Sequence, residues 1–200
     1  MENFSEQIEN KNQKKFLSPF SSFIFDLIKL VVLAFIIVWP IHRFVFQPFY
    51  VSGPSMESNF YNNDYLIIEK ITYYFRQPLR GEVIIFQSPI NSKDHLIKRV
   101  IGLPGEKIAI EKGQIIIYNH QFPQGIILKE EYLTPGTGTP GQTTIELKED
   151  EYYVLGDNRN MSLDSRSFGT IKEKNITGRA WFRGLPTRNA GLVKTPIFIY

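Results

Sequence analysis

The sequence predicts a mainly β protein: an antiparallel β-sheet domain with an inserted β cap, preceded by one N-terminal transmembrane helix. Three observations lead to this fold class. One apolar segment lies near the N-terminus, short β-branched runs separated by turn residues follow it, and no stretch after Val51 keeps a helical period. The 200 residues suffice for one domain of ordinary size with a sizeable insertion.

The apolar segment is residues 20–41, and its centre from Leu30 to Trp39 carries no charge. A helix that spans a bilayer needs about 20 such residues, so we predict a transmembrane anchor here. Asp26 and Lys29 then lie near one end, where lysine can reach the headgroups. The alternatives are a buried core helix and a cleaved signal peptide, although no small-residue cleavage site follows Trp39.

The basic residues beside this segment predict its orientation. Residues 1–19 are polar, and their lysines together with Lys29 outnumber Arg43, which alone lies just after the span. Cytoplasmic flanks carry the excess of Lys and Arg. We therefore expect a cytoplasmic tail over residues 1–19, a single span of the cell membrane, and an extracytoplasmic domain over residues 42–200.

The rest of the chain shows the signals of strands. Short runs rich in β-branched and aromatic residues alternate with turn residues, and they are residues 65–68, 82–86, 95–101, 107–111, 114–118, 152–155 and 176–182. Lys112-Gly113 is typical of a hairpin turn. Residues 134–144 are rich in Gly, Pro and Thr and predict a mobile loop. We interpret about 105–150 as an inserted cap on the main sheet.

The composition excludes several kinds of chemistry. The chain has no cysteine, and its three histidines show no metal-ligand spacing, so we expect no metal site. The net charge is only +3 and no basic run alternates with aromatic residues, so we expect no nucleic-acid partner. Any catalysis has to use hydroxyls, carboxylates, lysines or arginines.

Ser55 is a candidate nucleophile because it lies in the Gly/Pro-rich turn Ser52-Gly53-Pro54-Ser55-Met56, shortly after the anchor. Most serines in such turns only cap a local backbone group. A nucleophilic serine needs a base. The three histidines are poorly placed for that role, and lysine is a known substitute for histidine in this chemistry.

Lys98 is the candidate base, because Leu96, Ile97, Val100 and Ile101 flank it and burial can lower the pKa of a lysine by several units. At an ordinary pKa of about 10.4, only about 0.4% of a lysine is neutral at pH 8. On a strand its side chain faces away from that of Arg99. The alternative is a lysine that protects a sheet edge from aggregation.

A third stretch, from Gly156 to Arg166, concentrates charged and hydrogen-bonding side chains: Asp157, Arg159, Ser162, Asp164 and Arg166. Such groups can make a catalytic loop rigid, and Ser162 could hydrogen-bond the lysine and orient it. The alternative is a solvated turn whose surface ion pairs contribute little.

These motifs together resemble those of the bacterial type I signal peptidases. In chain order they are an anchor, Gly-x-Ser-Met, Lys-Arg-x-x-Gly-x-Pro-Gly-Glu and Gly-Asp-Asn-Arg-x-x-Ser-x-Asp-Ser-Arg, and residues 80–86 resemble a further segment of the family. The resemblance implies a membrane-anchored serine endopeptidase that removes signal peptides from exported preproteins. It implies cleavage after small residues of the Ala-x-Ala type through an acyl-enzyme.

The resemblance also implies roles for particular residues. Ser55 is then the nucleophile, Lys98 the general base and Ser162 the support of the lysine. Two ion pairs, Asp157 with Arg99 and Asp164 with Arg166, would brace the site. The implied partners are exported preproteins and the lipid bilayer, with the protein-export machinery as a further candidate, and no cofactor is needed.

Two departures from the family pattern lie near Ser55. The family usually has a residue followed by Pro-Thr after the methionine, whereas this chain has Glu57-Ser58-Asn59. Some members carry a serine as an oxyanion donor where this chain has Gly53.

Two rival interpretations remain open. One is a self-cleaving SOS-type repressor, which would carry a DNA-binding domain in place of the anchor. The other is a non-catalytic membrane-anchored β-domain that binds exported chains.

Overall fold

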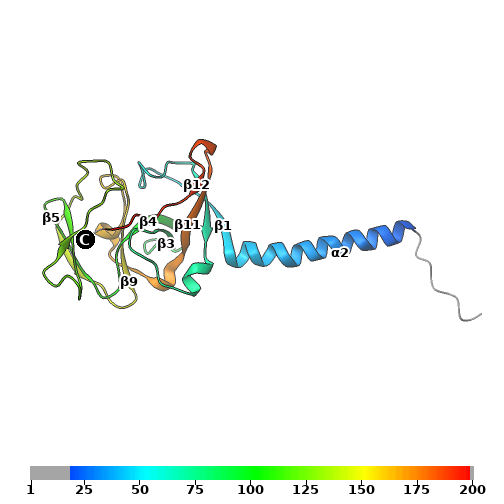
Figure 1. Cartoon of the computed structure of the whole chain (residues 1–200), viewed down its shortest axis with the longest axis horizontal. Coiled ribbons are helices and arrows are strands. Elements are labelled where there is room, and N and C mark those ends of the chain that lie inside the picture. The colour runs from blue at the N-terminus through cyan, green and yellow to red at the C-terminus, as the bar shows by residue number, and fades with distance from the viewer. Residues whose placement is uncertain (1–18, 199–200) are drawn as a thin grey trace, which may run out of the picture. The chain divides into compact units, whose positions relative to one another are not determined.

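The computed structural model describes residues 19–198, so nearly all of the expected tail lies outside the described residues. The chain forms two units, one ending at Arg43 and one beginning at Phe44. The first contains helix α2 (Pro19–Pro40), and one π-helical turn (Ile41–Val45) leads into the second (Figure 1). The α-helix ends at Pro40, where proline supplies no N–H to continue the hydrogen-bond ladder.

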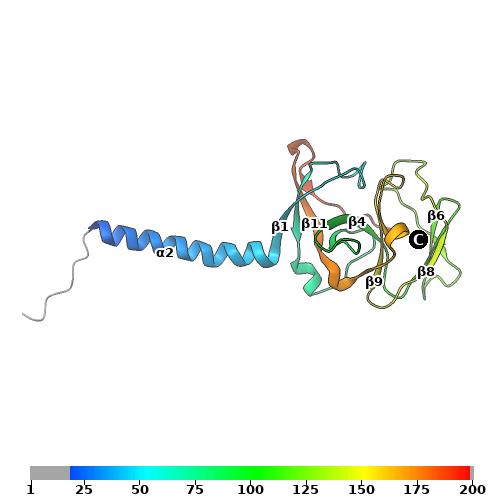
Figure 2. The ribbon, with the colours of Figure 1, turned by 180° about the vertical axis from the view of Figure 1, so that it is seen from behind.

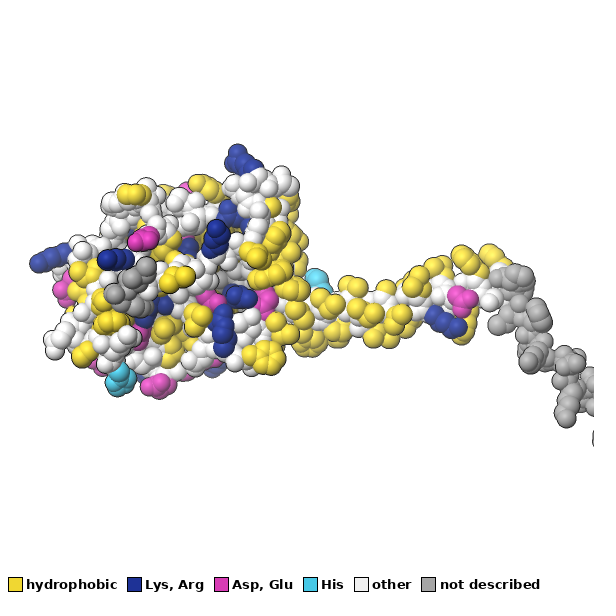
Figure 3. Space-filling model, in the orientation of Figure 1, with side chains coloured by type: hydrophobic (Ala, Val, Ile, Leu, Met, Phe, Trp, Pro, Cys, Tyr) yellow, Lys and Arg dark blue, Asp and Glu magenta, His cyan; other side chains and the backbone are white. Residues whose placement is uncertain are grey.

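The apolar side chains of α2 are exposed along its whole length (Figure 3), for example Phe35 with 64% and Val38 with 61% of the side chain accessible. The helical segment from Phe20 to Val45 is long and apolar enough to cross a membrane. The two charged residues of the span, Asp26 and Lys29, form an ion pair of 3.3 Å.

The second unit is built on two antiparallel sheets. The larger has eight strands in the order β1-β2-β11-β3-β4-β9-β10, with β12 paired to β11. Its strands are β1 (Phe46–Tyr50), β2 (Tyr65–Glu69), β3 (Val83–Gln87), β4 (His95–Gly102), β9 (Glu151–Leu155), β10 (Ile171–Lys172), β11 (Ile176–Leu185) and β12 (Gly191–Leu192). Strand β4 therefore lies inside the sheet, hydrogen-bonded to β3 on one side and to β9 on the other.

The smaller sheet has four strands in the order β7-β6-β5-β8, and all of them lie between β4 and β9 in the sequence. They are β5 (Lys107–Glu111), β6 (Gln114–Tyr118), β7 (Ile126–Ile127) and β8 (Thr143–Glu146). Lys112 and Gly113 both have positive φ and form the tight turn between β5 and β6, so the expected hairpin is confirmed. Within this unit the smaller sheet lies on the side away from β1 (Figure 2).

Between β1 and residue 198, helical structure is limited to short turns. These are α3 (Ser165–Phe168) and the 3-10 turns η2 (Ile71–Tyr74), η3 (Glu173–Asn175) and η4 (Thr187–Asn189). The prediction of a mainly β, antiparallel fold is therefore correct.

The segment expected as a mobile loop, residues 134–144, is partly a strand. Thr143 and Thr144 belong to β8 and pair with Ile110 and Ala109 of β5. Thr139 is 1% exposed, and its N–H donates to the carbonyl oxygen of Gly113 at 2.9 Å. Local Gly and Pro content does not reveal these contacts, because the partners lie far away in the sequence.

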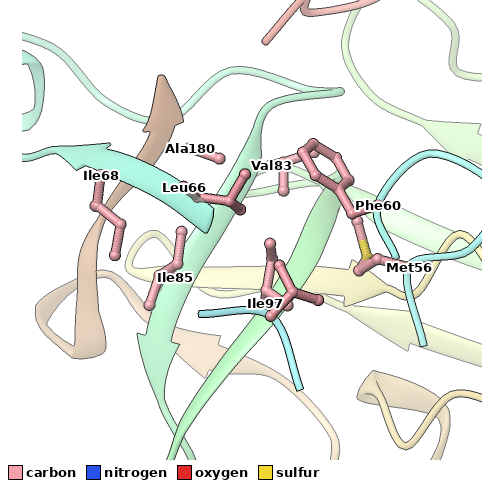
Figure 4. Packing of buried hydrophobic residues seen from close by; sticks show 9 residues of the cluster. Met56, Phe60, Leu66, Ile68, Val83, Ile85, Ile97 and Ala180 are labelled. Atoms are coloured by element: carbon pink, nitrogen blue, oxygen red, sulfur yellow. The ribbon is translucent and has the colours of Figure 1, made fainter. Parts of the chain in front are cut away.

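The hydrophobic core connects the turn that carries Ser55 to the main sheet. Met56 and Phe60 are at most 3% exposed and pack with residues of β2, β3 and β4 (Figure 4). The other members labelled in that figure are Leu66, Ile68, Val83, Ile85, Ile97 and Ala180. Burial of these side chains fixes the turn against β4, the strand that carries Lys98.

A second core cluster lies between the two sheets and includes Ile101 of β4, Tyr153 of β9 and Ile108 of β5. Gly102 permits this close approach, because a Cβ atom there would lie 2.0 Å from Ile108 Cδ1 and 2.7 Å from Leu147 Cδ1. The inserted strands therefore pack onto the end of the strand that carries Lys98, rather than forming a separate globule.

Candidate active site

Ser55 lies in the turn Gly53–Phe60 between β1 and β2, which we call the serine turn. Its side chain is half-buried. The carbonyl oxygen of Ser55 accepts a hydrogen bond of 3.1 Å from the N–H of Asn158, and the N–H of Gly53 donates to Asn62 Oδ1 at 2.9 Å. The serine turn is thus tied to the loop after β9 as well as to the core.

The structure brings Lys98 Nζ to 2.7 Å from Ser55 Oγ, although the two residues are 43 positions apart. Lys98 is 3% exposed, and its amine also lies 2.8 Å from the carbonyl oxygen of Ile97. A neutral amine in this position can accept the proton of the serine hydroxyl. A sheet-edge lysine is excluded, because β4 has a neighbour on each side.

Burial lowers the pKa of Lys98 to about 8, although the negative charges of Asp164 and Asp157 act in the opposite direction. The charged ammonium loses more by leaving water than it gains from the two carboxylates. With a pKa near 8, about half of the amine is neutral at pH 8, instead of well under one per cent for an ordinary lysine.

Arg99, the residue after Lys98, forms a bidentate ion pair with Asp157. The distances are 2.8 Å from Nε to Oδ1 and 2.6 Å from a terminal guanidinium nitrogen to Oδ2. Both residues are 3% exposed, and the guanidinium also donates to the carbonyl oxygen of Gly81 at 2.8 Å. Lys98 and Arg99 therefore contact different partners, as expected for consecutive residues on a strand.

Asp164 and Arg166 form a second bidentate pair, with both distances at 2.8 Å. Asp164 also caps α3 and accepts the N–H of Gly156 at 3.0 Å. Burial alone would raise the pKa of Asp164, but the hydrogen bonds from Arg166 and Gly156 outweigh it and keep the pKa below its ordinary value. The carboxylate is therefore charged at neutral pH.

Ser162 lies at the site without the hydrogen bond to Lys98 that the sequence suggested. Its hydroxyl oxygen is buried and has no partner in hydrogen-bonding geometry, although it is near enough to Asp164 to help lower the pKa of that carboxyl. A Cβ atom at Gly156 would lie 2.1 Å from Ser162 Oγ and 2.4 Å from the carbonyl oxygen of Ser55. The absence of a side chain at Gly156 therefore lets these groups meet.

Sequence reasoning missed Asn59 as a contributor to the site, and it named Arg159 without finding its partners. Asn59 donates from Nδ2 to Asp157 Oδ2 at 2.9 Å and to the carbonyl oxygen of Tyr132 at 3.0 Å. Arg159 is fully buried and joins the carbonyl oxygen of Gly156 to the carboxylate of Glu130 in the inserted segment. The only sequence signal was that Asn59 departs from the family pattern and that Arg159 belongs to the Gly-Asp-Asn-Arg motif.

The backbone around Ser55 supplies one candidate donor for an oxyanion, the N–H of Ser55 itself. Within residues 19–198, nothing accepts a hydrogen bond from the N–H of Ser55, and Pro54 has no N–H. Ser52 is exposed, and its hydroxyl makes no hydrogen bond within the described residues. Gly53 has φ of +91°.

In the described part of the chain, no three His, Asp or Glu side chains are grouped so that they could bind a metal ion. The arrangement instead provides a hydroxyl, a buried amine of lowered pKa and a free N–H. These are the parts of a serine hydrolase that uses a lysine base.

Comparisons with known proteins show what the chain is similar to. The model of the family described as "Signal peptidase, peptidase S26" matches residues 24–185. A probable signal peptidase I-2 of Synechocystis is 36% identical over 195 residues, covering 94% of this chain and 86% of the relative. A signal peptidase I of Leptolyngbya laminosa is 36% identical over 84% of this chain and 83% of its own. Signal peptidase I P of Bacillus subtilis subsp. natto is 32% identical over 78% and 85%.

The free hydroxyl of Ser52 and the positive φ of Gly53 generate one prediction. We expect Ser52→Ala to lower kcat less than about tenfold, because losing a true oxyanion donor typically costs about 100- to 1000-fold. Gly53→Ser is expected to lower activity, since φ of +91° strains any residue with a Cβ atom, although space around it is open. Steady-state cleavage of a preprotein by folded variants measures both. A loss of about 100-fold for Ser52→Ala would show that Ser52 is a donor after all.

Proposed function

The chain belongs to the S26 family of signal peptidases, and from this premise we propose that it is a membrane-anchored serine endopeptidase that removes signal peptides from exported preproteins. The observation that carries the mechanism is the contact of 2.7 Å between Ser55 Oγ and a buried lysine amine. A domain that only binds exported chains would not need a lysine whose pKa is lowered to about 8.

The proposed reaction begins with attack of Ser55 Oγ on the carbonyl carbon of the scissile peptide bond. Neutral Lys98 takes the hydroxyl proton, and the N–H of Ser55 donates to the oxyanion that forms. The carbon–nitrogen bond then breaks, and the leaving amine receives the proton from Lys98. A water molecule, deprotonated by Lys98, hydrolyses the acyl-enzyme and regenerates Ser55.

The neighbouring side chains are proposed to position the dyad. The Arg99–Asp157 pair joins β4 to the loop after β9, and the Asp164–Arg166 pair holds that loop in shape. Ser162 is proposed to orient Lys98, which is supported by its place beside Gly156 and by its unpaired hydroxyl. Leaving a buried hydroxyl without a partner is costly, so it is available to a group that moves during the reaction.

The membrane topology is part of the proposal. The single apolar segment would anchor the enzyme with its N-terminus in the cytoplasm and the β-domain outside, because the lysines lie at or before its N-terminal end. The proposed partners are exported preproteins and the lipid bilayer, with the export machinery as a further one.

The dyad itself is tested by substitution. We expect Ser55→Ala and Lys98→Ala each to abolish cleavage of a preprotein, because nucleophile and base act as one unit. Lys98→Arg should also be inactive, since a guanidinium does not give up its proton. The matched controls are Ser92→Ala and Lys93→Ala, two exposed residues that should keep normal activity. Near-normal cleavage by a folded Ser55→Ala or Lys98→Ala enzyme would contradict the assignment.

The lowered pKa of Lys98 predicts the pH dependence. The base acts when neutral, so kcat/KM should rise with pH and level off above an apparent pKa near 8. Below that value the rate should fall about tenfold per pH unit, as the fraction of neutral amine does. A profile that rises only near pH 10 would mean that another group takes the proton.

The topology is tested by proteolysis. Protease added outside intact spheroplasts should digest the segment after His42 and spare residues 1–19, as the distribution of basic residues requires. Antibodies against each end detect which part survives, and spheroplasts opened with detergent provide the control in which both parts are digested. Digestion of the tail alone would reverse the proposed orientation.

A further inference from the structure

Asn59 occupies an unusual place in the site, because its side chain touches two segments that are distant in sequence. Nδ2 lies 2.9 Å from Asp157 Oδ2, 98 residues away, and 3.0 Å from the carbonyl oxygen of Tyr132, 73 residues away. Asn59 itself lies four residues after Ser55, at the end of the serine turn, and its N–H donates to the carbonyl oxygen of Met56.

The chemistry of these two partners determines what side chain can do this. A peptide carbonyl and a carboxylate that already pairs with Arg99 can only accept hydrogen bonds, so the amide must present its nitrogen to both. An uncharged nitrogen with two N–H donors is found only in Asn and Gln. Both amide hydrogens of Asn59 are thereby used.

The two bonds join the parts of the molecule that hold the dyad. Asp157 is bound to Arg99, the neighbour of Lys98 on β4, and the ring of Tyr132 covers the guanidinium of Arg99 at 4.1 Å. The backbone bond from Asn158 to Ser55 is a second link between the same loop and the serine turn. One of the connections between the serine turn and the strand of Lys98 therefore passes through Asn59.

We propose that Asn59 is a positioning residue for the reaction, whose amide holds the serine turn in register with β4 by bridging Asp157 and the inserted segment. This inference rests on the proposed function, since it takes the Ser55–Lys98 dyad to be the reacting pair. Asn59 acts through Asp157 and Arg99 and does not touch the hydroxyl of Ser55 in the structure.

Asn59→Ala should lower kcat for a preprotein about 10- to 100-fold while KM changes little, because a small displacement of nucleophile from base is felt mainly in the transition state. A residue that only stabilised the fold would lower the melting temperature and leave kcat unchanged in assays well below that temperature. Circular dichroism in detergent establishes that each full-length variant is folded under the assay conditions.

Three further variants make the test specific. Asn59→Thr keeps one donor and should recover part of the lost kcat, whereas Asn59→Asp has no donor, faces Asp157 with a like charge, and should be at least as slow as Asn59→Ala. If Asn59→Ala does not fold, the kcat of Asn59→Thr is compared with that of Asn59→Asp, and a higher kcat for Asn59→Thr supports the role of the donor. The matched control is Asn91→Ala in the turn between β3 and β4, an exposed asparagine whose Nδ2 also donates to a carboxylate, Asp94 Oδ2 at 2.9 Å, and this change should alter kcat less than about twofold.

The outcomes separate this inference from the proposed function. If the unaltered enzyme cleaves the preprotein, Ser55→Ala does not, and folded Asn59→Ala retains kcat within about twofold, only the role of Asn59 is overturned. Full activity of Asn59→Asp would overturn it equally. If Ser55→Ala still cleaves, the proposed function fails first, whatever Asn59 does.

Discussion

The removal of the Lys98 amine from water is the constraint on which the rest of the site depends. A lysine serves as a base only when it is neutral, and its pKa of about 8 results from burial on a strand with a neighbour on each side. Two carboxylates nearby would raise that pKa further if they were unpaired. Each is bound by a guanidinium, Asp157 by Arg99 and Asp164 by Arg166, so their effect on Lys98 is weakened and burial dominates.

The inserted segment contributes to this arrangement by direct contact. Tyr132 covers Arg99, and Glu130 together with Thr139 binds the buried guanidinium of Arg159 next to Gly156. Buried ion pairs of this kind offer little net stability, but losing one partner leaves a costly unpaired charge. The segment between β7 and β8 is therefore part of what holds the loop after β9 in shape, and Gly102 allows the inserted strands to pack closely on β4.

The sequence predicted most of this fold because the long strands carry their own signal. Runs such as residues 114–118 are β-branched, and the hairpin at Lys112-Gly113 needs only local geometry. Short strands such as β7 and β12 have too few residues for a pattern, and β8 forms because β5 pairs with it. Motifs could name Ser55 and Lys98, but neither the bond from Asn59 to Asp157 nor the unpaired hydroxyl of Ser162 has a sequence signature.

The serine turn lacks the proline that the family usually has after Met56, and the structure shows which contacts hold the turn in shape instead. Where a proline fixes φ by covalent geometry, this chain relies on side chains: Met56 and Phe60 in the core, Asn62 on the N–H of Gly53, and Asn59 on Asp157. The same contacts hold Gly53 at φ of +91°, a backbone conformation that is strained for serine. A serine at that position, and the second oxyanion donor that it would supply, is thus disfavoured in this turn. Because these contacts come from distant segments, the serine turn is held beside Lys98 by the loop after β9 and the inserted segment as well as by the core.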